Sequence, residues 1–233
     1  MHPHLISITK DFEKNANALK AADFHKYMMG NFNFFGIKTP LRRHLCKIHF
    51  RHHIVCTTKE MNDIVKEAWA LDLREYQYYA IELIIANKKL WNEETIELID
   101  FCMSTKSWWD TIDPIDAGIL ADYFKNFPQH IKPYSLKWND SDNIWLQRSS
   151  IIFQKHFKKD TDCVMLTQYI EKHLSSEVYH VQKAIGWALR EYSKINAEWV
   201  QQFIDTHELK IVSLREAKRR LYIDDEVEEE ESL

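Results

Sequence analysis

The sequence predicts an all-α fold, an α-solenoid of antiparallel helix pairs. Gly accounts for only 4 and Pro for only 5 of the 233 residues, against an average usage of roughly 7% and 5%, so a sandwich, barrel or Rossmann fold would lack turn residues. Trp, Tyr and Phe are plentiful, at 8, 10 and 12 residues, which excludes a disordered chain. Apolar residues recur at helical spacing, and similar residues return about every 35 positions, the period of an α-solenoid.

Helical periodicity of the apolar residues defines the successive elements. Near the N-terminus, Leu41, Leu45 and Ile48 lie at i, i+4 and i+7 and predict one buried helix face. Further apolar sets at helical spacing follow along the chain, at 64–71, 81–85, 120–127 and 151–157. We expect about a dozen helices of roughly 10 to 18 residues, packed antiparallel because the breaks between them are short. The breaks lie at Thr39-Pro40, Asn92, Phe127-Pro128, Asn139-Asp140-Ser141-Asp142 and Ser175-Ser176.

The repeat is clearest in two sets of positions. Gln77, Gln147 and Gln182 lie at intervals of 70 and 35, and each follows a polar break and opens an apolar helical segment. The second set runs in steps of 35 through Tyr78, Asp113, Arg148 and Lys183. Two helices per repeat of this length are typical of HEAT or armadillo repeats. The solenoid is therefore expected to be HEAT-like.

The second set also predicts a functional surface. Equivalent positions of successive repeats stack on one face of a solenoid, so Asp113, Arg148 and Lys183 should line one concave groove. Trp109 lies one helical turn before Asp113, and Trp187 lies one turn after Lys183. The expected groove therefore holds a carboxylate, two cations and two indole rings.

Charge divides the chain into a body and a tail. The formal net charge is −4, but residues 224–233 hold seven acidic side chains and no basic one. The body, residues 1–223, then has 31 basic and 28 acidic side chains, and we expect it to form a single HEAT-like domain. The acidic segment 224–233 is expected to be a disordered tail. A mildly basic body permits binding to nucleic acid without requiring it.

Cysteine usage and hydropathy bear on the compartment and on metals. Four cysteines are scattered along the chain, at Cys46, Cys56, Cys102 and Cys163. Their spacing argues against a zinc site and against a disulfide framework. The N-terminus carries no apolar signal region, and no apolar run approaches the roughly 18 residues of a membrane helix, so we expect a soluble, cytoplasmic protein. His49, His52 and His53 have helical spacing suited to a metal, but no acid or cysteine completes the set, so they are interpreted as surface residues.

Several segments resemble one family in order along the chain. They are SWWDTID at 107–113, SDNIWLQR at 141–148, QKAIGWALREY at 182–192 and, nearer the N-terminus, FGIKTPLRR at 35–43. This set is similar to the AlkD family of bacterial alkylpurine DNA glycosylases. The resemblance extends over residues 2–222 and leaves the acidic tail outside it.

The resemblance implies a monomeric DNA repair enzyme that uses no metal and no cofactor. Such an enzyme cups duplex DNA in its concave face and excises cationic N3- and N7-alkylated purines without the need to flip the lesion. Carried over to this sequence, Asp113 is the catalytic carboxylate, Trp109 and Trp187 flank the sugar of the lesion, and Arg148 contacts the phosphate backbone. His180 departs from the aromatic residue expected at its position. Further DNA contacts are expected at Tyr27, Thr39, Arg43, Lys47, Lys183 and Arg190.

These residue types suit that chemistry. A purine alkylated at N3 or N7 is already cationic, so it leaves as a neutral base without a general acid. The deoxyribose becomes oxocarbenium-like as the bond breaks, and a carboxylate stabilises that charge and orients the attacking water. Indole faces attract cationic groups, and the planar fork of arginine suits phosphate.

A structural role competes with catalysis at Asp113. Asp113 precedes Pro114 and Asp116, in the pattern of an N-cap followed by proline at the first helical position. Alternatively the helix starts at Ser107, where Asp110 would complete a capping box. In that case Pro114 lies inside the helix and should kink it.

Other assignments have alternatives as well. Trp109 and Trp187 suit a core as well as a groove, although Trp108 is the better core candidate. Arg148 alternatively pairs with an acid such as Asp142 at the surface. Two other functions fit the same fold: a DNA-structure-binding paralogue without excision, and a protein-interaction scaffold.

Overall fold

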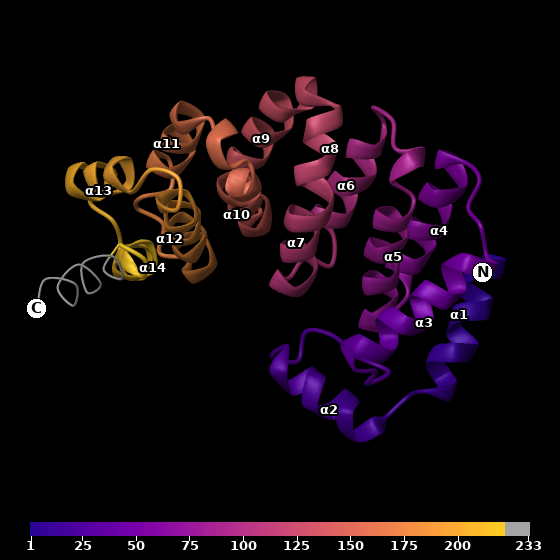
Figure 1. Cartoon of the computed structure of the whole chain (residues 1–233). Helices are drawn as coiled ribbons and strands as arrows, with labels where there is room; N and C mark the ends of the chain where they lie inside the picture. Colours follow the sequence, from indigo (N-terminus) through magenta and orange to yellow (C-terminus); the bar gives the residue numbers. More distant parts are fainter. Residues whose placement is uncertain (222–233) are drawn as a thin grey trace, which may run out of the picture. The chain divides into compact units, whose positions relative to one another are not determined.

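The structure, a computed structural model, describes residues 1–221, in which helices alternate with short loops and turns (Figure 1). Within them the extended pairing is limited to one isolated bridge between Asn33 and Leu73, so the predicted all-α solenoid class is confirmed. The described residues form two compact units, the first ending at Cys102 and the second beginning at Met103. A single domain over residues 1–223 stays a prediction, and the acidic segment 224–233 lies outside the described residues. No helix of the described part is long and apolar enough to cross a membrane.

The first unit holds the helices up to the start of α6. They are α1 (Pro3–Lys14), α2 (Ala18–Tyr27), α3 (Thr39–His52), α4 (Thr58–Ala70) and α5 (Arg74–Ala86), followed by a 3₁₀ turn (Lys88–Leu90) and by α6 (Thr95–Ser104), which ends just beyond the unit boundary. Here α1 packs on α3 and α4, and α5 packs on α3 and α4.

The second unit continues the alternation of helices and short turns. Its helices are α7 (Trp109–Ile115), a π-helical segment (Asp116–Leu120), α8 (Ala121–Asn126), α9 (Ile131–Asn139), α10 (Ile144–Ile152), α11 (Cys163–Glu171), α12 (Tyr179–Ser193), α13 (Ala197–Thr206) and α14 (Ile211–Lys218), with 3₁₀ turns at Pro128–His130, Phe153–His156 and Lys158–Asp160. The expected breaks near 92, 127, 140 and 175 all separate helices. Several helices are shorter than expected, down to 6 residues in α8.

A buried carboxylate anchors the loop before α3 in the first unit. Glu75 is 1% exposed, and its two oxygens accept hydrogen bonds from the backbone N–H groups of Phe35, Gly36 and Ile37 at 2.9 to 3.1 Å. Gly36 has φ +84°, and a Cβ there would lie 2.2 Å from the carbonyl oxygen of Asn17. The loop therefore needs glycine at this position for its conformation and for its close approach to α2.

The buried face of α3 differs from the predicted one. Leu41 and Ile48 are 41% and 39% exposed, so the expected apolar face is wrong. The buried residues of α3 are Arg42, Cys46 and His49. Polar side chains occupy this face because partners satisfy them: the Arg42 guanidinium lies 2.9 Å from a carboxylate oxygen of Glu82 on α5 and 4.2 Å from the centre of the Tyr78 ring.

One of the histidines interpreted as surface residues, His49 on α3, differs from the prediction, whereas His52 is exposed. His49 is 3% exposed, so its interpretation as a surface residue is wrong. Its ring stacks on that of His53 at 4.2 Å and meets the rings of His4 and Tyr79 at 5.6 and 5.7 Å. Burial lowers the pKa of His49 to about 4, with the neighbouring His53 as the next cause. The neutral imidazole of His49 therefore packs in the core as an uncharged planar ring.

The long helix α12 organises the second unit. It packs against α10, α13 and α14 (Figure 1), and its buried residues include Val181, Ile185 and Leu189. Gly186 faces α14, where an added Cβ would lie 2.6 Å from the backbone oxygen of Ser213 and 2.6 Å from the Cβ of Glu216. The absence of a side chain at Gly186 is what lets these two helices approach so closely.

The three glutamines of the repeat share one structural role. Gln77, Gln147 and Gln182 each donate a side-chain hydrogen bond to the backbone carbonyl six residues earlier, at 2.9, 2.7 and 3.0 Å. Each bond ties the loop before the helix to the helix it opens. The 35-residue period therefore reflects a repeated structural contact, which follows from the need to satisfy buried loop carbonyls.

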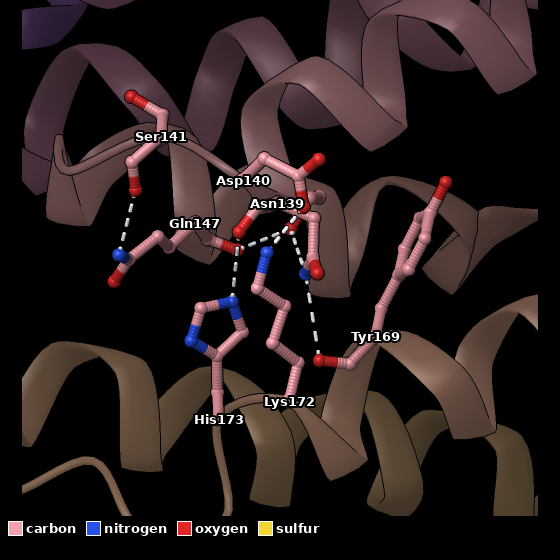
Figure 2. A network of polar contacts seen from close by, with 8 residues as sticks. Asn139, Asp140, Ser141, Gln147, Tyr169, Lys172 and His173 are labelled. Atoms are coloured by element: carbon pink, nitrogen blue, oxygen red, sulfur yellow. Dashed lines mark hydrogen bonds and ion pairs between the residues drawn. The ribbon is translucent and has the colours of Figure 1, made fainter.

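Figure 2 shows how the loop between α9 and α10 is held against α11 and the residues that follow it. Asn139 donates to the backbone oxygen of Tyr169 at 3.4 Å, while its own carbonyl lies 3.2 Å from a ring nitrogen of His173. Lys172 and Asp140 form an ion pair at the surface. These contacts thus hold the turn between α9 and α10 against α11, which also packs on α10.

Candidate active site

The central pair of the candidate site joins α7 to α10. The Arg148 guanidinium donates from Nη2 to a carboxylate oxygen of Asp113 at 2.8 Å and from Nη1 to the backbone oxygen of His180 at 3.2 Å. The Arg148 side chain is 3% exposed, and that of Asp113 is 30% exposed. The two residues stand 35 positions apart, so the repeat spacing correctly predicts that they are neighbours. Arg148 pairs with Asp113 and not with the surface Asp142 that the sequence also allowed.

The local fold of α7 explains why the Asp113 carboxylate is available. Helix α7 begins at Trp109, its N-cap is Trp108, and no side chain caps it. The N-cap interpretation of Asp113 is therefore wrong, because Asp113 lies inside the helix. The capping box at Ser107 is wrong too, since the Ser107 hydroxyl donates to the backbone oxygen of Met103.

Pro114 lies inside α7, as the second alternative expected. Proline has no N–H to donate to the carbonyl four residues earlier, and the chain passes directly from α7 into the π-helical segment Asp116–Leu120. Single π turns of this kind occur frequently at functional sites. The proline therefore changes the helical register just after Asp113 instead of starting a new helix there.

Trp187 lies beside the ion pair with two cations near its ring. The carbon at the centre of the Arg148 guanidinium is 5.5 Å from the ring centre, and Nζ of Lys155 is 4.0 Å from it. Both distances fall in the range of cation–π contacts. Trp187 itself is half-buried on α12, so the structure brings three of the predicted residues, Asp113, Arg148 and Trp187, into one cluster.

A second carboxyl group lies one turn beyond Asp113. Asp116 is completely buried; one of its oxygens accepts a hydrogen bond from the Ser149 hydroxyl at 3.2 Å, and the other has no hydrogen-bond partner within the described residues. Burial raises the pKa of Asp116 to about 7, a rise that nearby Lys155 counteracts. Burial likewise lowers the pKa of Lys155.

A wall of aromatic rings adjoins the ion pair. Trp108 packs against Trp145 and His180 with ring centres 5.2 and 5.8 Å apart, and Trp145 lies 4.7 Å from His180. Burial, with the Arg148 charge as the next cause, lowers the pKa of His180, so this ring is neutral near pH 7. Trp108 and Trp109 are both half-buried, so the structure does not single out Trp108 as the core residue of the two.

Two further predicted DNA contacts of the second unit, Lys183 and Arg190, have their contacts outside the cluster of Asp113, Arg148 and Trp187. Lys183 is half-buried, with its Nζ 5.8 Å from the ring of the exposed Tyr179. Arg190 forms an ion pair with Glu216 on α14 and lies 3.8 Å from Glu191. Arg190 is therefore tied into the contact between α12 and α14.

The remaining predicted contacts belong to the first unit. Tyr27 is 68% exposed near the end of α2. Thr39 and Lys47 are exposed on α3, and Arg43, which is 70% exposed, lies 3.9 Å from Glu82. The exposure of these side chains suits binding to a large polyanion, while their role as DNA contacts stays a prediction.

The described residues contain no group of three or more His, Cys, Asp or Glu side chains arranged to hold a metal ion. The histidines His4, His49 and His53 are brought together, but by ring packing. Any metal-free or cofactor-free mechanism remains a prediction from the sequence.

Sequence reasoning missed Asp116, Ser149 and Lys155. In the sequence, Asp116 enters only as part of a capping pattern. Two acids three residues apart lie on one helix face, and this spacing is the signal that could place Asp116 beside Asp113. Ser149 directly follows Arg148, and nothing in its type marks it out. Lys155 comes from the 3₁₀ turn Phe153–His156, whose approach to Trp187 depends on tertiary packing.

Comparison with known proteins identifies the family of the chain. Residues 8–221 match the family model of the DNA alkylation repair enzymes. A solved structure from Enterococcus faecalis, described as a predicted DNA alkylation repair enzyme, has 26% sequence identity and a TM-score of 0.83, and the match covers 89% of this chain and 97% of that one. No curated protein matches the chain. Because the family model spans nearly all of the described residues, the chain belongs to the DNA alkylation repair enzyme family.

Proposed function

We propose that the chain is a monofunctional alkylpurine DNA glycosylase that hydrolyses the N-glycosidic bond of cationic N3- and N7-alkylated purines in duplex DNA. The observation that carries this proposal is the pair of Asp113 and Arg148. The carboxylate is 30% exposed, while the guanidinium that holds it is 3% exposed. The Asp113 carboxylate is thus held by a buried guanidinium and is still partly accessible to solvent. This arrangement suits a cationic substrate that approaches from solvent. Membership of a DNA alkylation repair family supports DNA as the partner.

The reaction requires little acid–base chemistry from the protein. The bond between C1′ of the sugar and the alkylated nitrogen breaks, and its electron pair leaves with the purine, which becomes neutral. Positive charge then develops on the deoxyribose, where the Asp113 carboxylate stabilises it and accepts a hydrogen bond from the attacking water. The water oxygen bonds to C1′, and its proton passes to solvent through Asp113.

Arg148 acts through Asp113 in this proposal. A charge-assisted hydrogen bond of 2.8 Å holds the carboxylate in one orientation before the substrate arrives, which avoids reorganisation during the reaction. The predicted contact of Arg148 with a phosphate does not follow from this arrangement, because the Arg148 side chain is 3% exposed. Trp187 and Trp109 supply ring faces for the sugar.

The remaining contacts would hold the duplex. Exposed or half-buried polar residues on α2, α3 and α12 suit the sugar–phosphate backbone, and they are Tyr27, Thr39, Arg43, Lys47 and Lys183. Such contacts position the duplex without reading its sequence, and their number sets the salt dependence of binding. We expect the protein to act as a monomer in the cytoplasm.

The test is release of 7-methylguanine from a modified duplex in the presence of a chelator. We expect free base to appear above the spontaneous rate, and Asp113→Asn to lower that rate by about 100-fold or more while DNA binding persists. Asp142→Asn is the matched control, because Asp142 is an exposed acid of the same unit. Release that is unchanged in Asp113→Asn would overturn the assignment of the carboxylate.

One observation favours a second candidate, a DNA-structure-binding protein without excision. The Asp113 carboxylate already has an ion pair, which in a non-catalytic protein would simply hold α7 to α10. Tight, salt-dependent binding to the modified duplex without any base release would support this second candidate.

A further inference from the structure

The buried carboxyl group of Asp116 needs an explanation beyond packing. A completely buried carboxyl group is costly unless it is paired or protonated, and Asp116 has one hydrogen bond, from Ser149, and one oxygen without a partner in the described residues. Burial raises its pKa to about 7. The group therefore changes charge within the range in which a repair enzyme works.

Lys155 provides the complementary charge. Its ammonium group lies 4.0 Å from the centre of the Trp187 ring. Burial lowers the pKa of Lys155, and Asp116 and then Asp113 are the largest opposing influences. Asp116 is thus the largest of the charges that favour the ammonium form of Lys155, at the indole that the proposed function places beside the sugar.

The charges around Asp116 come from each element packed against it. Asp113 precedes it on α7, Arg148 and Ser149 face it from α10, and Lys155 faces it from the 3₁₀ turn Phe153–His156. On α8, Asp122 and Lys125 pair with each other at the surface at 3.5 Å. On α12, the Glu191 carboxylate interacts with Lys155 and with Trp187. The cluster therefore holds two cations and three carboxyl groups, of which Arg148 and Asp113 form a direct ion pair.

We propose that Asp116 is a positioning residue that compensates the charge of Lys155 beside Trp187 and so sets the net charge that the site offers to the developing cation. This inference rests on the proposed glycosylase function. Protonation of Asp116 removes one negative charge from the cluster, which disfavours positive charge on the sugar. When Asp116 is ionised, that negative charge is restored, and the same transition state is less disfavoured.

The decisive variants keep the shape and change the charge. Asp116→Asn preserves an acceptor for the Ser149 hydroxyl but stays neutral, and Lys155→Met removes the ammonium but keeps an unbranched chain against Trp187. We expect Asp116→Asn to slow 7-methylguanine release on the order of tenfold at pH 8, the effect of one partly buried charge. The double variant Asp116→Asn/Lys155→Met should recover most of that loss.

The pH profile gives a readout that a purely structural role would not change. Release by the wild-type protein, corrected for spontaneous loss of base, should rise several-fold from pH 6 to pH 8, as Asp116 ionises. The profile of Asp116→Asn should be flat over the same range. A double variant that is as slow as Asp116→Asn, or an Asp116→Asn profile that still rises, would overturn the inference.

An independent measurement separates failure of this inference from failure of the proposed function. The carbonyl stretch of a protonated carboxyl group in the infrared spectrum should disappear between pH 6 and pH 8 in the wild-type protein and be absent at both pH values in Asp116→Asn. In Lys155→Met it should persist to higher pH, because the stabilising cation is gone. If the wild-type protein releases no base, the glycosylase proposal fails; if Lys155→Met leaves the infrared titration unchanged, the coupling of Asp116 to Lys155 is refuted.

Discussion

Replacement of Gly186 by alanine tests the contact between α12 and α14, because two physical effects predict opposite signs. Gly186 lies in the middle of α12, where helix propensity alone would make alanine more stable by about 1 kcal/mol. An alanine Cβ, however, would lie 2.6 Å from the Ser213 carbonyl oxygen and 3.1 Å from the Ser213 Cα. Backbone atoms cannot rotate away, so the helices must separate.

The magnitude follows from these two effects. Overpacking of a filled site costs about 1 to 3 kcal/mol, and more where backbone must move. Separation of the helices would also strain the hydrogen bond from the Ser213 hydroxyl to the Gln182 carbonyl, now 2.8 Å, and the ion pair of Arg190 with Glu216. Because backbone atoms block the site, the upper end of that cost, about 3 kcal/mol, applies; subtraction of the propensity gain of about 1 kcal/mol leaves an expected net destabilisation of about 2 kcal/mol.

Urea unfolding monitored by circular dichroism measures this change in the free energy of unfolding. Gln202→Gly, at an exposed position of α13, is the control that calibrates helix propensity in the same unit, and it should cost about 1 kcal/mol. If Gly186→Ala stabilises the protein by about the amount that Gln202→Gly loses, the close approach of α12 and α14 is refuted.

Three further predictions concern buried charges and histidines. The folded-state pKa of His49 is lowered from 6.5 to about 4, so its contribution to stability is full above pH 6.5 and is lost as the pH falls towards 4; the free energies of unfolding from urea titrations at pH 7.5 and 4.5 should differ by up to about 3 kcal/mol through this group, and His49→Phe should reduce the difference. Glu75→Gln should cost about 2 kcal/mol in the same assay, because an amide nitrogen would then face the Phe35 N–H that now donates to a carboxylate oxygen at 3.0 Å; an unchanged midpoint would contradict this role. Arg148→Ala should cost about 2 kcal/mol because it removes hydrogen bonds to Asp113 and to the His180 carbonyl, whereas Asp142→Asn at the surface should leave stability unchanged within about 0.5 kcal/mol.

Local patterns in the sequence were enough to predict the helical class, most of the breaks and the proximity of Asp113 to Arg148, although not their ion pair. The scarcity of Gly and Pro is a property of the composition, and the helical spacing of apolar residues is a property of short chain segments. Both can therefore be interpreted without knowledge of the fold. The 35-residue period also carried real information, because Gln77, Gln147 and Gln182 repeat one hydrogen bond to a loop carbonyl.

Tertiary packing decided what those patterns left open. The buried face of α3 carries Arg42 and His49 instead of Leu41 and Ile48, because partners on other helices satisfy the polar groups there. The helix begins at Trp109 and continues through Pro114, which removes Asp113 from the cap position that local preferences favour. Asp116 and Lys155 joined the site only through burial and through contacts between separate elements. Burial and the electrostatic field around a charge are properties of the assembled core, so no local spacing reports them.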